Sequence, residues 1–284
     1  MSSQPLCFLN GVTHPPQNIH NRAQAYGDGV FETIRVICGH APLLPLHLAR
    51  LKRGLECLGI GHQTATWQYI TDFMQLLARS TLGPEASAQA VSGKVKIVAY
   101  REAGGHGYAP IPNASAHVLL YFEPLSLSGW MQTPKQLVDA SMPLSSNPQL
   151  AKIKHLNRLD YILAAHRTPI QQDQALLLYN AQHAVVESLH HNIFIVHGKT
   201  VTTPELIDAG VEGVFKRFLI ESVFTDIALH IQEKTVTEDD VLNADAVFLT
   251  NALTGVTPIS HYKNRCFTHD DFYIRLLKKI QQHI

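Results

Sequence analysis

The sequence predicts a protein of two lobes, each of mixed helices and strands (α/β or α+β), with the smaller lobe at the N-terminus. The chain has 284 residues, which is too long for one small core. Helix-like and strand-like periodicities mix along it without strict alternation, which argues against a doubly wound sheet. Residues 123–135 contain two prolines and no clear period, which is typical of a linker. We therefore expect lobes at 1–122 and 136–284.

The small lobe is expected to contain four strands and two helices. Runs rich in β-branched and aromatic residues predict the strands. Leucines at spacings of three and four predict the first helix, and a second apolar face follows it. The expected strands are 6–12, 30–37, 95–100 and 116–122, and the expected helices are 46–60 and a following helix with Ile70, Phe73, Met74 and Leu77 on one face.

The large lobe is expected to contain six strands and three helices. One helix has Leu156, Leu159 and Leu163 in register, and Pro169 ends it. The segment after residue 250 is read as a loop that follows a strand. The expected strands are 136–141, 175–180, 184–188, 192–197, 228–234 and 246–250, and the expected helices are 155–167, 213–224 and Asp271 to the end.

Composition excludes several classes of function. Lys plus Arg and Asp plus Glu each number 23, so no basic field exists for nucleic acid or an anionic membrane. No apolar run reaches the roughly 18 residues of a membrane span, and the start MSSQPLCFLNGV lacks the basic segment of a signal peptide. Four scattered cysteines and 17 histidines without an H-E-x-x-H motif predict neither a disulfide scaffold nor a metal site. We expect a cytoplasmic protein.

Two motifs of the small lobe could carry function. Residues 26–32 (YGDGVFE) place two glycines around an aspartate, which permits a tight turn with positive φ before a strand. Arg50 lies beside the apolar stripe of its helix, where a guanidinium can reach a cleft and grip a phosphate with two hydrogen bonds. A plain turn and a solvated arginine are the alternatives, and either motif alone leaves them open.

A lysine motif stands at the start of a predicted helix. Lys154 lies where a loop enters that helix, within residues 152–159 (KIKHLNRL). A lysine that is partly desolvated and near other cations has a lowered pKa and can act as an amine nucleophile. An ordinary surface lysine is the alternative, and Lys152 is expected to be one.

Three further segments of the large lobe are candidates for binding. Glu187 lies in an apolar, strand-like run, so it either faces solvent or is buried with a counter-charge. A protonated pyridine nitrogen would supply such a charge. Residues 209–214 (AGVEGV) bracket a helix start with glycines, which suits an anion. Residues 251–258 (NALTGVTP) form a loop after a strand, and ordinary turns are the alternative for both.

In this order and at these spacings, the segments resemble the fold-type IV pyridoxal-phosphate enzymes. That family contains branched-chain aminotransferases, D-amino-acid aminotransferases and aminodeoxychorismate lyases. The likeness runs from about residue 8 to about residue 262. Residues 147–159 (NPQLAKIKHLNRL) are similar to the N-P-x-L-A-x-I-K-H-L-N-R-L pattern of the lyases, and Arg101 with residues 104–108 is similar to their R-x-x-G-G-x-G-Y loop.

The resemblance implies pyridoxal 5'-phosphate as cofactor, carried covalently by Lys154 as the catalytic residue. Arg50 would hold the cofactor phosphate, and Glu187 would pair with the pyridine nitrogen. Further contacts to the cofactor would come from the side chain of Asn192, the backbone N–H groups of Val214 and Phe215, and the loop at Asn251.

The resemblance also implies substrate contacts, a partner and a reaction. Phe31, Arg101 and Tyr108 would bind the substrate, and a homodimer is expected, with the loop 101–108 reaching the partner's site. The implied reaction is that of an aminodeoxychorismate lyase, which releases pyruvate from 4-amino-4-deoxychorismate and leaves p-aminobenzoate for folate biosynthesis.

Two alternatives remain open from the sequence. A D-amino-acid or branched-chain aminotransferase is supported by Glu32, which aminotransferases share, whereas some lyases have threonine there. His106 also stands where some lyases carry arginine. A non-catalytic binding protein on the same scaffold would lack the lysine or the carboxylate that faces the pyridine, and this chain has both.

Overall fold

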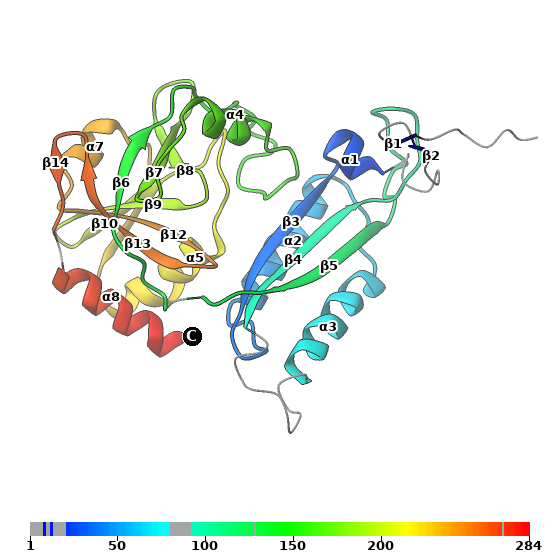
Figure 1. Ribbon diagram of the computed structural model, residues 1–284, viewed down its shortest axis with the longest axis horizontal. Coiled ribbons are helices and arrows are strands. Elements are labelled where there is room, and N and C mark those ends of the chain that lie inside the picture. The colour runs from blue at the N-terminus through cyan, green and yellow to red at the C-terminus, as the bar shows by residue number, and fades with distance from the viewer. Residues whose placement is uncertain (1–7, 10–11, 14–20, 80–91, 128, 269) are drawn as a thin grey trace, which may run out of the picture.

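Two lobes lie side by side, joined by the chain that runs from one sheet to the other (Figure 1). The computed structural model of the protein describes residues 8–9, 12–13, 21–79, 92–127, 129–268 and 270–284. The predicted class, a small N-terminal lobe and a larger C-terminal lobe of mixed helices and strands, is confirmed. The exact boundaries 1–122, 123–135 and 136–284 stay a prediction.

The small lobe is a three-stranded antiparallel sheet with helices on one face (Figure 1). Its strands lie in the order β3-β4-β5, and Thr33 pairs with Lys96. A short antiparallel pair, β1 and β2, precedes them. The elements are β1 Phe8–Leu9, β2 Val12–Thr13, α1 Arg22–Tyr26, β3 Gly29–Val36, α2 Leu44–Cys57, α3 Thr64–Arg79, β4 Gly93–Arg101 and β5 Ala116–Pro124.

Alternation along these strands separates a core face from a second, more polar face. Val95, Ile97 and Ala99 of β4 are buried against α2 and α3. Lys94 and Lys96 alternate with these residues and therefore point to the other face of the sheet. That second face is the one that Phe31 of β3 shares.

The large lobe is built on a nine-stranded mixed sheet. The strand order is β11-β10-β9-β12-β13-β6-β7-β8, and β14 pairs with β13. Its elements are β6 Lys135–Asp139, α4 Leu159–Arg167, β7 Gln174–Tyr179, β8 Val185–Ser188, β9 Asn192–His197, β10 Thr200–Pro204, α5 Val214–Phe218, the π-helix η3 Leu219–Val223, α6 Phe224–Asp226, β11 His230–Lys234, α7 Glu238–Leu242, β12 Ala246–Asn251, β13 Gly255–Tyr262, β14 Arg265–Cys266 and α8 Asp270–His283.

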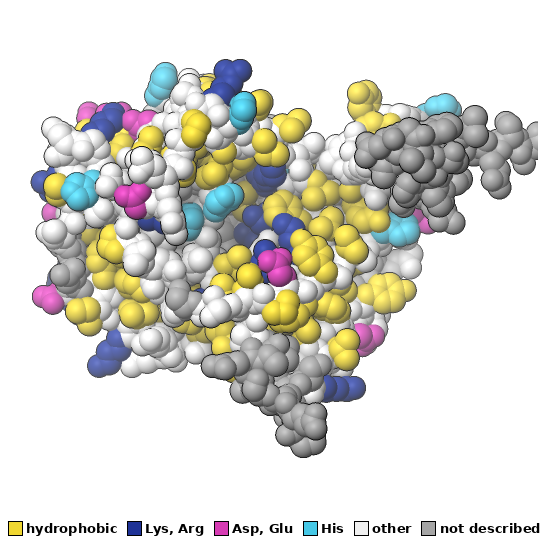
Figure 2. All heavy atoms as spheres, in the orientation of Figure 1, with side chains coloured by type: hydrophobic (Ala, Val, Ile, Leu, Met, Phe, Trp, Pro, Cys, Tyr) yellow, Lys and Arg dark blue, Asp and Glu magenta, His cyan; other side chains and the backbone are white. Residues whose placement is uncertain are grey.

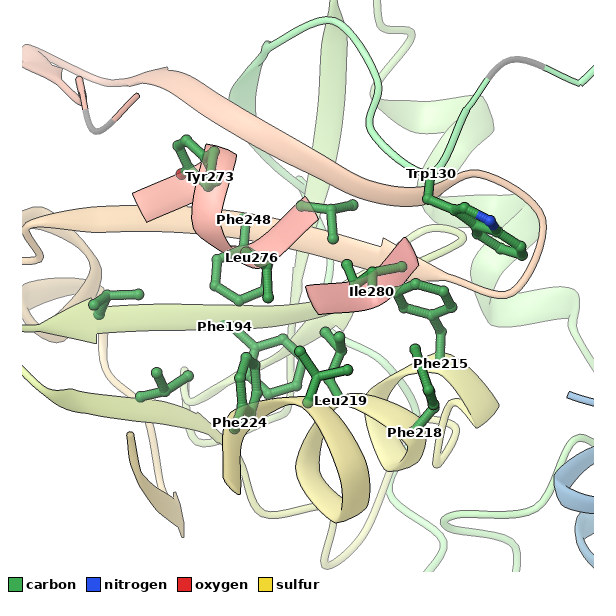
Figure 3. Close-up of a cluster of buried hydrophobic side chains, with 14 of the residues drawn as sticks. Trp130, Phe194, Phe215, Phe218, Leu219, Phe224, Phe248, Tyr273, Leu276 and Ile280 are labelled. Carbon is green, nitrogen blue, oxygen red and sulfur yellow. The ribbon is translucent and has the colours of Figure 1, made fainter. Parts of the chain in front are cut away.

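Both faces of the large sheet are buried, which explains its nearly continuous apolar strands. Along β9, Phe194 packs on one face and Ile193 and Ile195 on the other. Figure 3 shows the aromatic core on the first face, where Phe194 and Phe248 stack with ring centroids 5.1 Å apart beneath the helices α5 and α8. Strands of this sheet carry the candidate site residues of the large lobe, such as Glu187 on β8.

Most predicted elements are confirmed, two are corrected, and four were not expected. The unexpected elements are α1, β10, α7 and β14. The predicted loop 251–258 becomes the strand β13 from Gly255, because its β-branched residues pair with β12. The predicted helix 155–167 begins only at Leu159, since the residues before it pair with β3. Of the predicted strand 6–12, residues 6, 7, 10 and 11 lie outside the described part of the chain.

Candidate active site

The lysine segment, residues 152–159, lies between the two lobes and forms backbone hydrogen bonds with both. On the large-lobe side, the Lys152 amide donates to Gly210 (3.0 Å) and its carbonyl accepts from the Glu212 amide (3.0 Å). On the small-lobe side, the Phe31 amide donates to the carbonyl of Lys154 (2.9 Å). The Leu156 amide likewise donates to the carbonyl of Gly29 (2.9 Å). The backbone on both sides of Lys154 is therefore held in place.

The two glycines of the YGDG turn make this docking possible. Gly27 has φ 63°, as the motif predicts, and its carbonyl accepts a hydrogen bond from the Asn157 side chain (3.1 Å). A Cβ at Gly27 would come within 2.5 Å of that side chain, and a Cβ at Gly29 within 2.9 Å of Leu156. The glycines thus serve the close approach of the lysine segment to β3.

The amine of Lys154 lies in a poorly solvated, cationic site. Burial and the charge of Arg50 together lower the pKa of Lys154 to about 7, against the raising effects of Glu32 and Glu187. Its Nζ lies 4.4 Å from the centre of the Phe31 ring. An amine with this pKa is a competent nucleophile and base near neutral pH.

Arg50 is held by a buried carboxylate of the neighbouring strand. Its Nε and one terminal nitrogen donate to the two oxygens of Glu32 at 2.8 and 2.6 Å, and His47 Nδ1 lies 2.6 Å from Glu32. The other terminal nitrogen donates to the carbonyl of Glu212 (2.9 Å). Burial alone would raise the pKa of Glu32, but Arg50 and His47 outweigh it and lower the pKa to about 2. Two of the five guanidinium N–H groups remain for an anion.

Glu187 points into the interior, not to solvent. Its side chain is 4% exposed. One oxygen accepts from the Tyr161 hydroxyl (2.5 Å), and the other from the Asn192 amide nitrogen and the Val211 backbone N–H, both at 3.2 Å. No cationic side chain forms an ion pair with Glu187 in the described ranges, and burial raises its pKa.

The start of α5 faces the same region. Asn192 binds the carbonyl of Val211 (2.8 Å), and a Cβ at Gly213 would come within 1.8 Å of the Asn192 side-chain oxygen. The first N–H groups of a helix have no partner within it, so those of Val214 and Phe215 are donors. The Phe215 ring is turned away into the core, where it stacks on Trp130.

The turn between β12 and β13 completes this end of the site. Asn251 accepts hydrogen bonds from the amides of Leu253 (3.0 Å) and Thr254 (2.8 Å) and so holds the turn. Thr250 lies opposite Asn192 across the β12–β9 pair, and its buried hydroxyl has no hydrogen-bond partner among the described residues.

The substrate residues predicted from the sequence fall into two groups. Phe31 lies beside Lys154, whereas Tyr108 is 88% exposed on the loop that follows β4 and packs edge-on against Tyr26. Arg101 is buried and donates to Asp28 (2.9 Å) and to the carbonyls of Leu58 (2.5 Å) and Gly59 (2.7 Å). A substrate contact by Arg101 stays a prediction.

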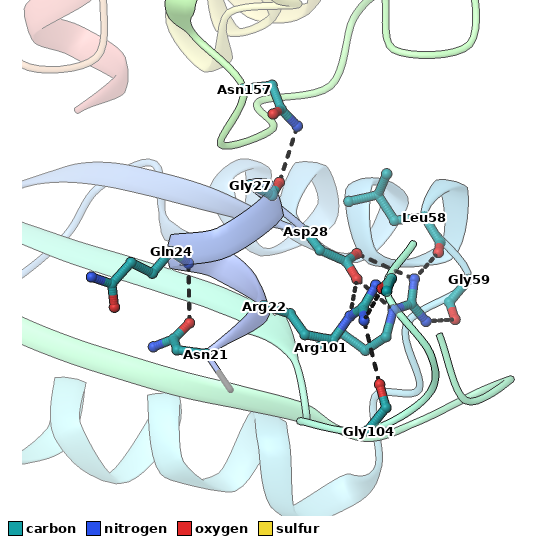
Figure 4. A network of polar contacts seen from close by, with 11 residues as sticks. Asn21, Arg22, Gln24, Gly27, Asp28, Leu58, Gly59, Arg101, Gly104 and Asn157 are labelled. Atoms are coloured by element: carbon teal, nitrogen blue, oxygen red, sulfur yellow. Dashed lines mark hydrogen bonds and ion pairs between the residues drawn. The ribbon is translucent and has the colours of Figure 1, made fainter. Parts of the chain in front are cut away.

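Arg101 belongs to a network that fixes the loop carrying Tyr108 (Figure 4). Arg22 donates to Asp28 (2.8 Å) and to the loop carbonyls of Gly104 (3.3 Å) and Gly107 (3.0 Å). Asp28 thereby joins two arginines, one on α1 and one at the end of β4. The aspartate of the YGDG turn is structural in this respect, which its spacing alone could not show.

Two site residues were missed from the sequence. Lys96 lies with its Nζ 3.9 Å from the centre of the Phe31 ring, and burial lowers its pKa. In the described ranges it forms no ion pair with an acidic side chain. Alternation along β4 is the signal that could have placed it on the site face. The other missed residue is Tyr161, whose hydroxyl donates a hydrogen bond to Glu187. Basic side chains gather where the lobes meet (Figure 2).

These residues fit pyridoxal phosphate. A buried carboxylate with only neutral donors lacks the cation that a pyridinium supplies. Away from this carboxylate, the site offers several donors that suit a phosphate. They are the two remaining N–H groups of Arg50, the first N–H groups of α5 and the unpaired hydroxyl of Thr250. Lys154, with its lowered pKa, is the amine that such a cofactor requires. The chemistry of the donors therefore matches both ends of the cofactor.

Fold and site define a class of pyridoxal-phosphate enzyme of fold-type IV. A model of the family described as amino-transferase class IV matches residues 29–262, and the chain belongs to this family. The family resemblance of the sequence is thereby confirmed. Some members of this family are lyases.

The relatives include lyases that are similar over nearly the whole chain. The aminodeoxychorismate lyase of Vibrio harveyi is 30% identical over 257 residues, which cover 89% of this chain and 90% of that protein. The aminodeoxychorismate lyase of Bacillus subtilis (strain 168) is 25% identical, covering 83% and 78%. The crystal structure of 4-amino-4-deoxychorismate lyase from Pseudomonas aeruginosa has a TM-score of 0.79 at 27% identity and covers 96% and 97%.

An aminotransferase structure shares the fold alone. The crystal structure of the branched-chain aminotransferase from Thermoproteus uzoniensis with norvaline has a TM-score of 0.77 at 20% identity and covers 97% of this chain and 93% of that chain.

In the described part of this chain, no cluster of three His, Cys, Asp or Glu side chains could hold a metal ion. Nor does any described helix have the length and apolarity to cross a bilayer.

Proposed function

We propose that the chain is a pyridoxal-phosphate-dependent 4-amino-4-deoxychorismate lyase, which forms p-aminobenzoate and pyruvate in folate biosynthesis. The observation that carries the proposal is the 30% identity to the Vibrio harveyi lyase over 89% of this chain. The family model, which matches residues 29–262, spans the lysine segment and both carboxylates near Lys154, so the chemistry of the site and the similarity support the same reaction.

The residues that would hold the cofactor come from both lobes. Arg50, the N–H groups of Val214 and Phe215, and the turn held by Asn251 would bind its phosphate. Lys154 would carry it covalently. Glu187, steadied by Asn192, would bind the protonated pyridine nitrogen. When bound, the cofactor supplies an electron sink for the electrons that leave the substrate's amine-bearing carbon.

Lys154 would move the protons of the reaction. Its freed amine removes the proton from the ring carbon that bears the substrate amine, as a general base. Departure of enolpyruvate then makes the ring aromatic, and the Lys154 ammonium returns a proton to the enol carbon. Glu187 keeps the proton on the pyridine nitrogen, which preserves the electron sink. Burial of the site keeps water from these groups.

The substrate carries two carboxylates, which need cationic partners. The ammonium of Lys96 lies over the same Phe31 ring as that of Lys154, so it would bind one carboxylate. Phe31 would pack against the substrate ring, and Tyr108 would contact substrate from its loop. Arg101 would serve the substrate through that loop, because its guanidinium is engaged with Asp28.

The homodimer and the cytoplasmic location are part of the proposal. Exposed apolar side chains, which a partner subunit could cover, lie on β5 and α4: Leu119, Tyr121, Leu159, Ile162 and Leu163. Tyr108 would then reach the partner's site. Light scattering that gives a fully active species of 31.5 kDa would contradict the dimer, and cell fractionation tests the location.

The reaction is tested without a keto-acid acceptor. Supplied with 4-amino-4-deoxychorismate alone, the holoenzyme should release p-aminobenzoate and pyruvate in equal amounts. The aminotransferase alternative predicts no release under these conditions and turnover of D-alanine with 2-oxoglutarate. Faster turnover in the second assay would assign the chain to the aminotransferases.

A further inference from the structure

Two side chains at the start of α4 connect Lys154 to Glu187. Arg158 donates from Nε to the carbonyl of His155 (3.0 Å) and from a terminal nitrogen to the carbonyl of Ile153 (3.0 Å). These carbonyls belong to the residues directly before and after Lys154. One guanidinium therefore holds the backbone on both sides of Lys154.

The same guanidinium lies over the ring of a tyrosine. Arg158 Cζ is 5.0 Å from the centre of the Tyr161 ring. The Tyr161 hydroxyl donates to Glu187 at 2.5 Å. A continuous set of contacts thus runs from the backbone at Lys154 through Arg158 and Tyr161 to the buried carboxylate of β8.

We propose that Arg158 and Tyr161 are positioning residues that hold Lys154 and Glu187 at a fixed separation and keep Glu187 ionised toward the pyridine nitrogen. The inference rests on the proposed cofactor, because those two residues would grip opposite ends of its ring system. The first turn of α4 would thereby help to keep the pyridine nitrogen of the cofactor protonated.

The Tyr161 hydroxyl has a direct chemical consequence at Glu187. A hydrogen bond donated to a carboxylate favours its charged form. Without it, the proton shared between Glu187 and the ring nitrogen would move toward the carboxylate, since burial already favours the neutral acid. The electron sink would then weaken, although every group that touches the cofactor would still be present.

The test uses Tyr161→Phe, which keeps the ring over Arg158 and removes only the hydroxyl. The holoenzyme is loaded with pyridoxal phosphate labelled with ¹⁵N in the ring, and the nitrogen resonance is followed with pH. We expect the resonance to shift toward the unprotonated value, and kcat to fall about tenfold, as for loss of one hydrogen bond to a charged group. KM should change less than twofold.

The matched control is Tyr179→Phe. Tyr179 also donates a 2.5 Å hydrogen bond to a carboxylate, Asp139, but that carboxylate lies outside the site. It should leave the ¹⁵N resonance unchanged. An unchanged resonance in Tyr161→Phe, with a protonated ring in the wild type, overturns the inference but not the proposed function. A wild type that captures no pyridoxal phosphate overturns both.

Arg158→Lys tests the other half of the connection. Lysine keeps the charge but cannot bridge two carbonyls as the planar guanidinium does. Release of pyridoxal phosphate to a scavenging apoenzyme should become at least about fivefold faster, a change of roughly 1 kcal/mol. Arg167→Lys, an exposed change at the end of the same helix, should release it at the wild-type rate. Equal release rates in the two variants would overturn the role of Arg158.

Discussion

Each lobe buries one carboxylate near Lys154, and the two have opposite surroundings. Glu32 of the small lobe accepts from Arg50 and lies against His47, and these partners lower its pKa to about 2 against the effect of burial. Glu187 of the large lobe accepts from Tyr161, Asn192 and the Val211 amide, and burial raises its pKa. Both side chains are almost fully buried.

The difference shows what each carboxylate does. Glu32 already has its cation within the protein, and it holds the guanidinium of Arg50 in place. Glu187 accepts hydrogen bonds only from neutral donors and forms no ion pair among the described residues, so its surroundings suit a cation brought by a ligand. An acidic residue in an apolar strand can thus be structural or functional, and its partners distinguish the two roles.

The largest effect is expected for the amine between the two carboxylates. Lys154→Ala should lower pyruvate release by about 10⁴-fold, because it removes the general base and acid of the reaction. The visible band of bound cofactor should also be lost. Lys152→Ala is the matched control and should keep both. Mass spectrometry after borohydride reduction would refute the assignment if it placed the cofactor on Lys152.

Glu32→Gln should destabilise the protein even without cofactor. It leaves the Arg50 guanidinium buried without a charged partner, which costs about 3–5 kcal/mol in the free energy of unfolding. Denaturant unfolding of the apoprotein measures it. Glu187→Gln should cost less, about 1–3 kcal/mol in the same experiment, because its amide nitrogen cannot accept the hydrogen bonds of Asn192 and Val211 but no cation is left buried without a partner. Equal destabilisation by both changes would remove the distinction between the carboxylates.

Glu187→Gln should instead affect turnover. It keeps the shape of the side chain but removes the charge that holds the proton on the pyridine nitrogen. We expect kcat to fall roughly 100-fold, the scale of losing one key electrostatic stabiliser, while the cofactor stays bound through Arg50 and Lys154. Steady-state kinetics and the visible spectrum test this together. Near-normal turnover with an unchanged spectrum would show that Glu187 does not act on the ring.

The smallest expected effect is a shift in pH dependence. Only the neutral amine of Lys154 can capture the cofactor, and its pKa is about 7. Capture by the apoprotein should therefore accelerate about tenfold per pH unit below 7 and level off above it. Because Glu187 raises the pKa of Lys154, its midpoint should lie lower in Glu187→Gln. Stopped-flow absorbance measures it, and a midpoint near the ordinary lysine value would contradict the lowered pKa.

Much of the fold could be predicted because its elements have local signals. The apolar stripe of α2 and the β-branched runs of β3, β9 and β12 predicted elements close to those observed. The strand β13 was missed because Gly255 and Pro258 near its start are typical of a loop, and it becomes a strand by pairing with β12. The helix α4 begins after the predicted residue because the backbone of Lys154 and Leu156 forms hydrogen bonds with β3 instead. That strand lies more than 100 residues away in the sequence.

For the site, the sequence alone determined which motifs occur and in what order, and hence the family, while Lys154, Arg50 and Glu187 stay its predictions for the cofactor site. Only the tertiary structure decided that Glu32 holds Arg50, that Arg101 turns toward Asp28, and that Lys96 and Tyr161 reach the site. These contacts join segments far apart in the chain. The energy of a buried charge depends on those neighbours and on its distance from water, and neither quantity is encoded in local spacing.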